Sequence, residues 1–240
     1  MSRERASVLV VGVGGLGCPA ALALARAGIG HLGICDDDLV ETTNLHRQIL
    51  FGERDIGAPK LDAAVRELHR QAPHATVRAH GARLLPGNAV EIVRGYDLVV
   101  EGSDNFATKF LAADACALTG TPIVHASAVR WIGTVLAVGA RAKPCYRCIF
   151  EDVPGDGAPT CAEAGVMGPV LGVIAAAQVD LALSLLDGAP VDGHLVTFDG
   201  RTDVLRRTTI SPRADCALCG QAPHIRRIEP MAYASAPYAG

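Results

Sequence analysis

The chain of 240 residues is long enough for one large α/β domain or two small ones, and half of its residues are hydrophobic. Only 20% are charged and the formal net charge is −3, so the sequence shows no electrostatic footprint for nucleic acid or for an anionic membrane surface. Aromatic residues make up 4%, and 26 glycines separate runs of Ala, Val, Leu and Ile, which is typical of strands and helices joined by tight turns.

The first half of the chain alternates two kinds of hydrophobic run. Short β-branched runs predict strands at 7–11, 29–35, 76–79, 96–101, 122–126 and 134–138. Longer periodic or alanine-rich runs predict helices at 19–27, 59–71, 88–94 and 105–119. This alternation predicts a parallel sheet with helices on both of its faces.

A long apolar run at 165–186 follows a stretch rich in Cys, Pro, Gly and Asp. It is long enough to cross a bilayer, but it contains Gln178 and Asp180 and is interrupted by glycine. We therefore expect a helix that is buried in the protein or in an interface, and no membrane span.

Two short runs after this helix, at 195–199 and 204–209, predict a hairpin that adds antiparallel strands. The sheet is thus predicted to be mixed, parallel in its N-terminal half and antiparallel in its C-terminal half. We expect residues 1–220 to form a single domain and residues 221–240, rich in Pro, Ala and Tyr, to form a poorly structured tail.

A glycine-rich turn joins the first predicted strand to the first predicted helix. Gly12, Gly14 and Gly17 have the spacing G-x-G-x-x-G, and Asp36 ends the next strand. Such glycines let the backbone approach a phosphate, the helix N-terminus supplies amide donors, and the acid suits a ribose. The predicted fold is therefore α/β and Rossmann-like. On these features alone NAD or FAD is the favoured ligand, although any adenine nucleotide needs the same geometry.

The polar segment 41–57 favours chemistry on phosphates. Asn44, Arg47 and Gln48 lie within five positions, and Lys60 follows the segment. A hydride-transfer site needs no such cluster, whereas a site that neutralises a triphosphate while its α-phosphate is attacked does need one. The alternative interpretation is a solvated polar loop.

Asp104 lies between the strand predicted at 96–101 and the helix predicted at 105–119. The carboxyl ends of strands face the ligand crevice in an open α/β sheet, so Asp104 is a candidate to hold Mg²⁺ against phosphates. A position directly before a helix fits an N-cap equally well.

Four of the eight cysteines form two C-x-x-C pairs, a spacing that places two thiolates on one tetrahedral Zn²⁺. Two matched pairs predict one closed, structural zinc site that joins two distant segments. The ligands are Cys145, Cys148, Cys216 and Cys219.

The other cysteines divide into core residues and one candidate nucleophile. Cys18, Cys35 and Cys116 lie in apolar runs and are expected in the core. Cys161 follows a stretch rich in Pro and Gly and precedes a helix, where helix amides favour a thiolate. The apolar run 8–11 is too short for a secretory signal, so a reducing cytoplasm is expected.

Seven sequence blocks resemble the ThiF/MoeB/HesA family of prokaryotic enzymes related to ubiquitin-activating E1 proteins. The blocks follow the family's order along nearly the whole chain: GVGGLG at 12–17, DDDLVETTNLHRQILF at 36–51, IGAPK at 56–60, GSDNFATK at 102–109, PCYRC at 144–148, TCAEAGVMGPVLGVI at 160–174 and CALCG at 216–220. The resemblance implies ATP-dependent adenylation of the C-terminal glycine of a small ubiquitin-like sulfur-carrier protein, in preparation for thiocarboxylate formation. The carrier and its pathway stay open.

The resemblance also implies roles for individual residues. Arg47, Lys60 and Asp104 are the expected catalytic residues, and Cys161 is a candidate for covalent attack on the acyl-adenylate. Positions that match the nucleotide and Mg²⁺ site are Gly12, Gly14, Gly15, Asp36, Asp38, Asn44, Arg47, Gln48, Lys60, Asp104 and Asn105. A structural Zn²⁺ on the four paired cysteines, a homodimer and a separate sulfur donor are implied as well.

The sequence departs from the family pattern at two places. Few residues precede the first strand, where the family has an arm whose Arg reaches the partner subunit; Arg3 or Arg5 is the candidate substitute, and a disordered start is the alternative. Lys109 and Ala113 stand where Arg and Asn are usual, which implies weaker contacts to phosphate. These departures leave open a weakened zinc scaffold that binds the carrier. An NAD-dependent oxidoreductase with the same glycine turn is the other alternative.

Overall fold

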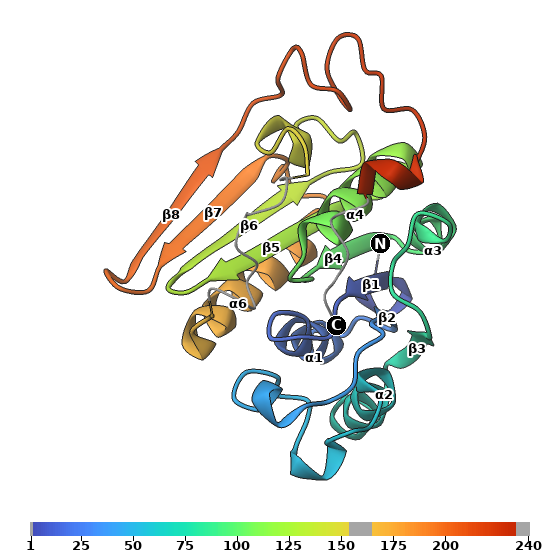
Figure 1. The fold of residues 1–240 in the computed structure, drawn as a ribbon, viewed down its shortest axis with the longest axis vertical. Helices are drawn as coiled ribbons and strands as arrows, with labels where there is room; N and C mark the ends of the chain where they lie inside the picture. Colours follow the sequence, from blue (N-terminus) through green and yellow to red (C-terminus); the bar gives the residue numbers. More distant parts are fainter. Residues whose placement is uncertain (1, 154–164, 234–240) are drawn as a thin grey trace.

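The computed structural model describes residues 2–153 and 165–233. One eight-stranded sheet runs through the protein in the order β3-β2-β1-β4-β5-β6-β7-β8 (Figure 1). The strands are β1 (Ser7–Val11), β2 (His31–Cys35), β3 (Thr76–His80), β4 (Leu98–Glu101), β5 (Ile123–Val129), β6 (Ile132–Val138), β7 (His194–Asp199) and β8 (Val204–Thr209). Neighbours from β3 to β5 pair in parallel and those from β5 to β8 pair antiparallel, which confirms the predicted mixed sheet.

Helices cover both faces of the sheet, as predicted (Figure 1). The described α-helices are α1 (Gly17–Arg26), α2 (Lys60–Gln71), α3 (Ala89–Arg94), α4 (Phe106–Thr119) and α6 (Gly168–Leu186). Short 3-10 helices lie at η1 (Arg3–Arg5), η2 (Thr42–Asn44), η3 (Glu53–Asp55), η4 (Tyr146–Cys148) and η5 (Pro230–Tyr233).

Alternating side chains of the central strands build two separate cores. On β1, Val8 and Val10 join the core that contains residues of α1, α2 and α6, whereas Leu9 and Val11 join the core that contains residues of α3 and α4. Since successive strand residues point to opposite faces, a strand that is apolar at every position is buried on both sides. Because β1 and β4 pair in parallel between these two cores, their carboxyl ends lie side by side.

Helix α6 is the one described helix that is long and apolar enough to cross a membrane, and half of its most apolar window is buried inside the protein. Its buried side, which includes Ile174 and Leu181, packs on β4, β5, β6 and α1. The opposite side exposes Gly172, Val173 and Ala176. The expected packing of this helix against the sheet is therefore confirmed.

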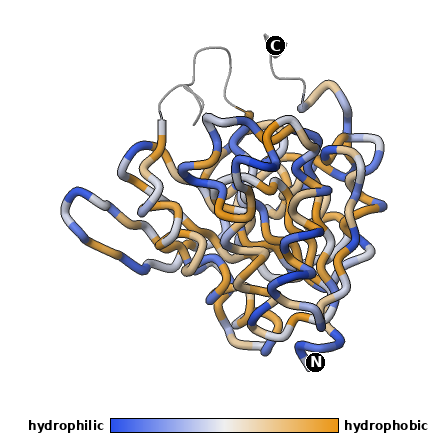
Figure 2. The backbone as a smooth tube through the Cα atoms, turned by 90° about the horizontal axis from the view of Figure 1, so that it is seen from below, coloured by the Kyte–Doolittle hydropathy of each residue, from blue (hydrophilic) through white to orange (hydrophobic). Residues whose placement is uncertain are grey.

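The C-terminal part of the described chain differs from the expectation of a poorly structured tail. Residues 221–229 lack regular elements, but η5 packs against α4 and the side chain of Tyr233 is buried. The Tyr233 hydroxyl donates to Asp114 Oδ2 at 2.7 Å. By contrast, β8 is exposed along its whole length, and the β7–β8 hairpin projects from the body (Figure 2).

Candidate active site and four-cysteine cluster

The turn after β1 can be built only with glycine at two of its positions. Gly12 has a φ of +83°, and a Cβ on it would lie 3.1 Å from the Cα of Ser103. A Cβ on Gly17 would lie 1.7 Å from the carbonyl oxygen of Gly12. The turn is therefore closed against the first turn of α1 and against the loop after β4. Its backbone amides lie beside the 102–105 loop at the carboxyl ends of β1 and β4, the expected position of the ligand crevice in an open α/β sheet.

Asp36, at the end of β2, is tied directly to this turn. Its Oδ2 accepts from the backbone N–H of Val13 at 2.7 Å, and its Oδ1 accepts from that of Asp38 at 2.9 Å. Burial raises the pKa of Asp36, although Lys60 and the two amides act in the opposite direction. Each carboxylate oxygen can accept a second hydrogen bond, so Asp36 can hold ribose hydroxyls beside the turn.

Lys60 is a buried cation at the first position of α2. Its Nζ lies 2.6 Å from Asp38 Oδ2 and 4.0 Å from Asp36 Oδ1. Burial lowers the pKa of Lys60, but Asp36 and Asp38, with a contribution from Asp104, outweigh burial and raise it. The Asp38 side chain is 65% exposed, so it can rotate into solvent, and the buried ammonium of Lys60 can then bind a phosphate in its place.

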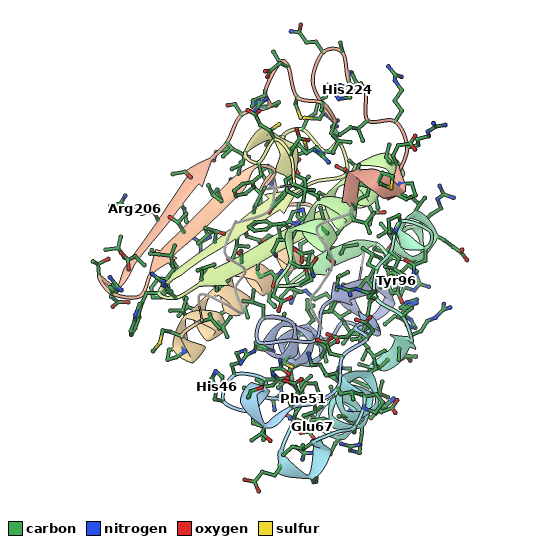
Figure 3. The ribbon with its side chains drawn as sticks, viewed as in Figure 1. His46, Phe51, Glu67, Tyr96, Arg206 and His224 are labelled. Carbon is green, nitrogen blue, oxygen red and sulfur yellow. The ribbon has the colours of Figure 1, made fainter. Side chains whose placement is uncertain are left out.

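Arg47 lies over the glycine turn. A Cβ on Gly15 would meet Arg47 Cδ at 3.4 Å and Leu171 Cδ1 at 2.6 Å, so glycine at this position makes room for both side chains. The guanidinium donates through Nη1 to the carbonyl of Thr43 at 2.9 Å. Figure 3 shows the neighbouring His46 beside α1. The half-buried side chain of Arg47 therefore packs on the glycine turn, while Thr43 and His46 beside it are exposed to solvent.

The two amide side chains of this segment are also buried. Asn44 is 8% exposed and Gln48 is 3% exposed. Gln48 Nε2 is 3.9 Å from the position of a Cβ on Gly14, and Gln48 Oε1 has no hydrogen-bond partner among the described residues. A buried acceptor without a partner is costly, so a donor in the crevice would stabilise it.

Asn105, and not Asp104, caps helix α4. Asn105 Oδ1 accepts from the backbone N–H of Thr108 at 2.8 Å. Asp104 is exposed and makes no hydrogen bond or ion pair within residues 2–153 and 165–233. The capping alternative for Asp104 is therefore wrong, and its carboxylate is available to a ligand.

Lys109 does not face the crevice, contrary to the expectation that it contacts phosphate. Its Nζ is buried and donates to Glu101 Oε2 at 2.8 Å and to the carbonyl of Ala126 at 2.6 Å. The sequence interpretation assigned no role to the buried polar residues behind the 102–105 loop, namely Glu101, His125 and Gln178, or to the hydrogen bond from Ser103 of the loop to Glu101. The available signal was a carboxylate that ends the otherwise apolar strand β4.

The two C-x-x-C pairs come together although they are far apart in the sequence. Sγ–Sγ distances are 3.9 Å for Cys145–Cys148, 3.5 Å for Cys145–Cys216 and 3.4 Å for Cys148–Cys219, and all four Sγ atoms lie within 4.8 Å of one another. Ligands at 2.3 Å from a tetrahedral zinc lie about 3.8 Å apart, so the four thiols fit one such ion. The backbone N–H of Arg213 also points at Cys148 Sγ, at 3.4 Å.

The other described cysteines lie in the core, and Arg3 is paired on the surface. Cys18, Cys35 and Cys116 are buried, as predicted, and burial raises the pKa of each thiol. Cys161 lies outside the described residues. Arg3, which precedes the amino end of β1, pairs with Asp187 at 2.7 Å.

Together these features define a Rossmann-like protein of the nucleotide-binding type with a cluster of four cysteines whose spacing suits a metal ion. Residues 3–218 match the ThiF family, and the chain belongs to this family. The family assignment made from the seven sequence blocks is thereby confirmed.

Individual relatives extend the comparison. The chain is 41% identical over 233 residues to a sulfur carrier protein adenylyltransferase of Thermus thermophilus, covering 94% of this chain and 86% of the relative. It is 42% identical to the adenylyltransferase and sulfurtransferase MOCS3 of Drosophila sechellia over 94% of this chain, but it spans about half (51%) of that relative's length. A crystal structure of E. coli MccB with MccA-N7isoASN has the same fold, with a TM-score of 0.81 at 22% identity, over 91% of this chain and 68% of that one.

Proposed function

We propose that this protein uses ATP to adenylate the C-terminal glycine of a small ubiquitin-like sulfur-carrier protein and so prepares the carrier for thiocarboxylate formation. The observation that carries the proposal is the packing of Arg47 on the glycine turn, together with Lys60 and Asp104, which are near enough for Asp104 to raise the pKa of Lys60. The names of the Thermus thermophilus and MOCS3 relatives support it.

In the proposed reaction a carboxylate oxygen of the carrier attacks the α-phosphorus of ATP, the bond to the bridging oxygen breaks, and pyrophosphate leaves. Both reactants are anions, so positioning and charge neutralisation are the main contributions of the protein. Arg47 and Lys60 neutralise phosphate oxygens, and Asp36 binds the ribose. Asp104 would be the residue that holds Mg²⁺, which when bound would supply further positive charge near the phosphates.

The remaining nucleotide contacts are proposed from position. Asn44 and Gln48 line the crevice beside Gly12, Gly14 and Gly15, and Asp38 shares Lys60 with the phosphates. Asn105 keeps its amide nitrogen for the ligand while its oxygen caps α4. Cys161 is retained as a candidate covalent nucleophile.

The cysteine cluster and the assembly state are part of the proposal. We propose that Cys145, Cys148, Cys216 and Cys219 bind one structural Zn²⁺, supported by their Sγ separations. Residues 1–220 are proposed as one adenylation domain with 221–240 as its tail, acting in the reducing cytoplasm that free thiols require.

A homodimer is also proposed, because α6 exposes small apolar residues on the side that faces away from the sheet. The sulfur-transfer step is assigned to a separate donor. Light scattering measured during size-exclusion chromatography tests the dimer.

Carrier-dependent exchange of labelled pyrophosphate into ATP tests the function. Wild-type protein with its carrier should exchange, and Arg47→Ala or Asp104→Ala should abolish exchange. Arg94→Ala, an exposed arginine on α3, is the matched control and should leave the rate unchanged. Wild-type rates in both active-site variants would overturn the assignments.

Thermal shift separates this proposal from its two alternatives. We expect ATP with Mg²⁺, and not NAD⁺, to raise the melting temperature. Stabilisation by NAD⁺ alone would favour the oxidoreductase. Stabilisation by a carrier without any exchange would favour a binding scaffold.

A further inference from the structure

A buried cluster of one ion pair and a histidine lies directly behind the loop that carries Asp104, and the proposed reaction does not use it. Its members are Glu101 at the end of β4, Lys109 on α4 and His125 on β5. Their side chains are 0%, 4% and 3% exposed.

The carboxylate of Glu101 is the centre of this cluster. Its Oε2 accepts from Lys109 Nζ at 2.8 Å and lies 3.2 Å from His125 Nδ1. Its Oε1 accepts from the backbone N–H of Ser103 at 2.7 Å and from the Ser103 hydroxyl. Ser103 immediately precedes Asp104, so both donors of one loop residue are fixed to one buried anion.

The surrounding elements hold Glu101 in place from several sides. Lys109 also donates to the carbonyl of Ala126 on β5. Gln178 of α6 donates to the carbonyls of Glu101 and Val124, at 2.8 and 2.9 Å. Burial raises the pKa of Glu101, but Lys109 and His125 outweigh burial and lower it to about 2, so the anion is permanent at neutral pH.

Stability alone is a poor reason for such a cluster. Replacing a buried ion pair by apolar residues of similar volume is often neutral or stabilising, because the desolvation cost offsets the attraction. The other end of β4 offers a comparison, since Asp97 Oδ2 accepts from the N–H and hydroxyl of Ser7 at 2.8 and 2.7 Å. That second carboxylate–serine contact is exposed and lies far from the glycine turn.

We propose that Glu101, with Lys109 and His125, is a positioning residue that holds Ser103 and thereby fixes the backbone from which Asp104 reaches the metal and phosphates. The ordering of the loop is a property of the free protein. Its consequence for catalysis rests on the proposed adenylation.

Hydrogen–deuterium exchange of the free protein tests the ordering. The variants are Ser103→Ala and the neutral pair Glu101→Leu with Lys109→Met, which leaves no buried charge unpaired. We expect the amides of Ser103 and Thr108, which are hydrogen-bonded to Glu101 and Asn105, to exchange about tenfold faster or more in both variants. Asp97→Asn, the control at the opposite end of β4, should leave these amides unchanged. Unchanged exchange in the folded double variant would overturn the proposal, whatever the activity of the protein.

Pyrophosphate exchange tests the consequence. In the double variant we expect kcat to fall about tenfold or more and the Mg²⁺ concentration for half-maximal rate to rise, with the KM for ATP changed less than about threefold. The single variant Lys109→Arg, which keeps both the cation and its partner Glu101, should retain most of the wild-type kcat. A lower melting temperature with unaltered Mg²⁺ dependence would show a merely structural role. Absence of exchange in the wild type would instead refute the proposed function and leave the hydrogen-exchange result standing.

Discussion

Asn105 Oδ1 accepts a hydrogen bond from the backbone N–H of Thr108 at 2.8 Å. This contact makes Asn105, and not its neighbour Asp104, the residue that caps helix α4. Because the cap of α4 is Asn105, the preceding Asp104 has no structural partner among the described residues and projects from the loop beside the glycine turn.

The two neighbours should therefore respond differently to alanine. Asn105→Ala removes the N-cap and should lower the free energy of unfolding by about 1 kcal/mol. Asp104→Ala should change it by less than about 0.5 kcal/mol while abolishing pyrophosphate exchange. Urea denaturation of both variants, compared with exchange rates, checks this. Equal destabilisation would mean that Asp104 also supports the helix.

Lys60→Met should abolish exchange by a different route. The buried ammonium offsets two carboxylates, and its loss leaves Asp36 with burial and repulsion from Asp38, both of which raise its pKa further. We expect the exchange rate to fall at least about 100-fold, as for loss of a preorganised charge. Lys60→Arg retains the charge and should keep part of the rate. A Met variant with full activity would contradict a role on the phosphates.

Zinc removal should destabilise the core that contains residues of α3 and α4, because Cys145, Cys216 and Cys219 belong to it. Cys216→Ser should lower bound zinc below one ion per chain, measured by atomic emission, and should lower the melting temperature. Cys35→Ser is the matched control, because its Sγ donates only to the carbonyl of Ala82 and a hydroxyl can replace it. Metal-free wild-type protein with an unchanged melting temperature would refute a structural role.

Tyr233→Phe should cost about 1–2 kcal/mol of unfolding free energy, since a buried hydrogen bond to a charged group is lost. Asp114, which accepts this hydrogen bond, also accepts two hydrogen bonds at 2.9 Å from Arg147. Arg147 lies between Cys145 and Cys148 in the sequence. Urea denaturation measures the change. No change would show that the C-terminal segment does not dock in solution.

Stability should fall in acid partly through Glu101. The pKa of its carboxyl is about 2 in the folded protein, below its ordinary value of 4.5, so its contribution to stability is complete above about pH 4.5 and is lost as the pH falls toward 2. Between about pH 5 and pH 3 the wild type should lose more unfolding free energy than the Glu101→Leu, Lys109→Met protein. Identical losses would contradict the lowered pKa.

The sequence by itself determined the features that depend on short-range pattern. The glycine spacing at 12–17 predicted a turn, and the alternation of hydrophobic runs predicted a mixed sheet. The two C-x-x-C pairs predicted a cysteine cluster, and the structure contains all three features. Such signals are readable because helix and strand periods and turn chemistry act over a few residues.

Only the tertiary structure decided how polar groups are paired. Glu101 meets His125 across 24 positions, Asp114 meets Tyr233 across 119, and Lys109 turns away from the crevice that its position in the motif had predicted for it. A charged side chain takes whichever partner the packed elements bring within reach, and burial then makes that pairing obligatory. Which charged side chains pair with one another is therefore decided only when the sheet and its helices are packed together.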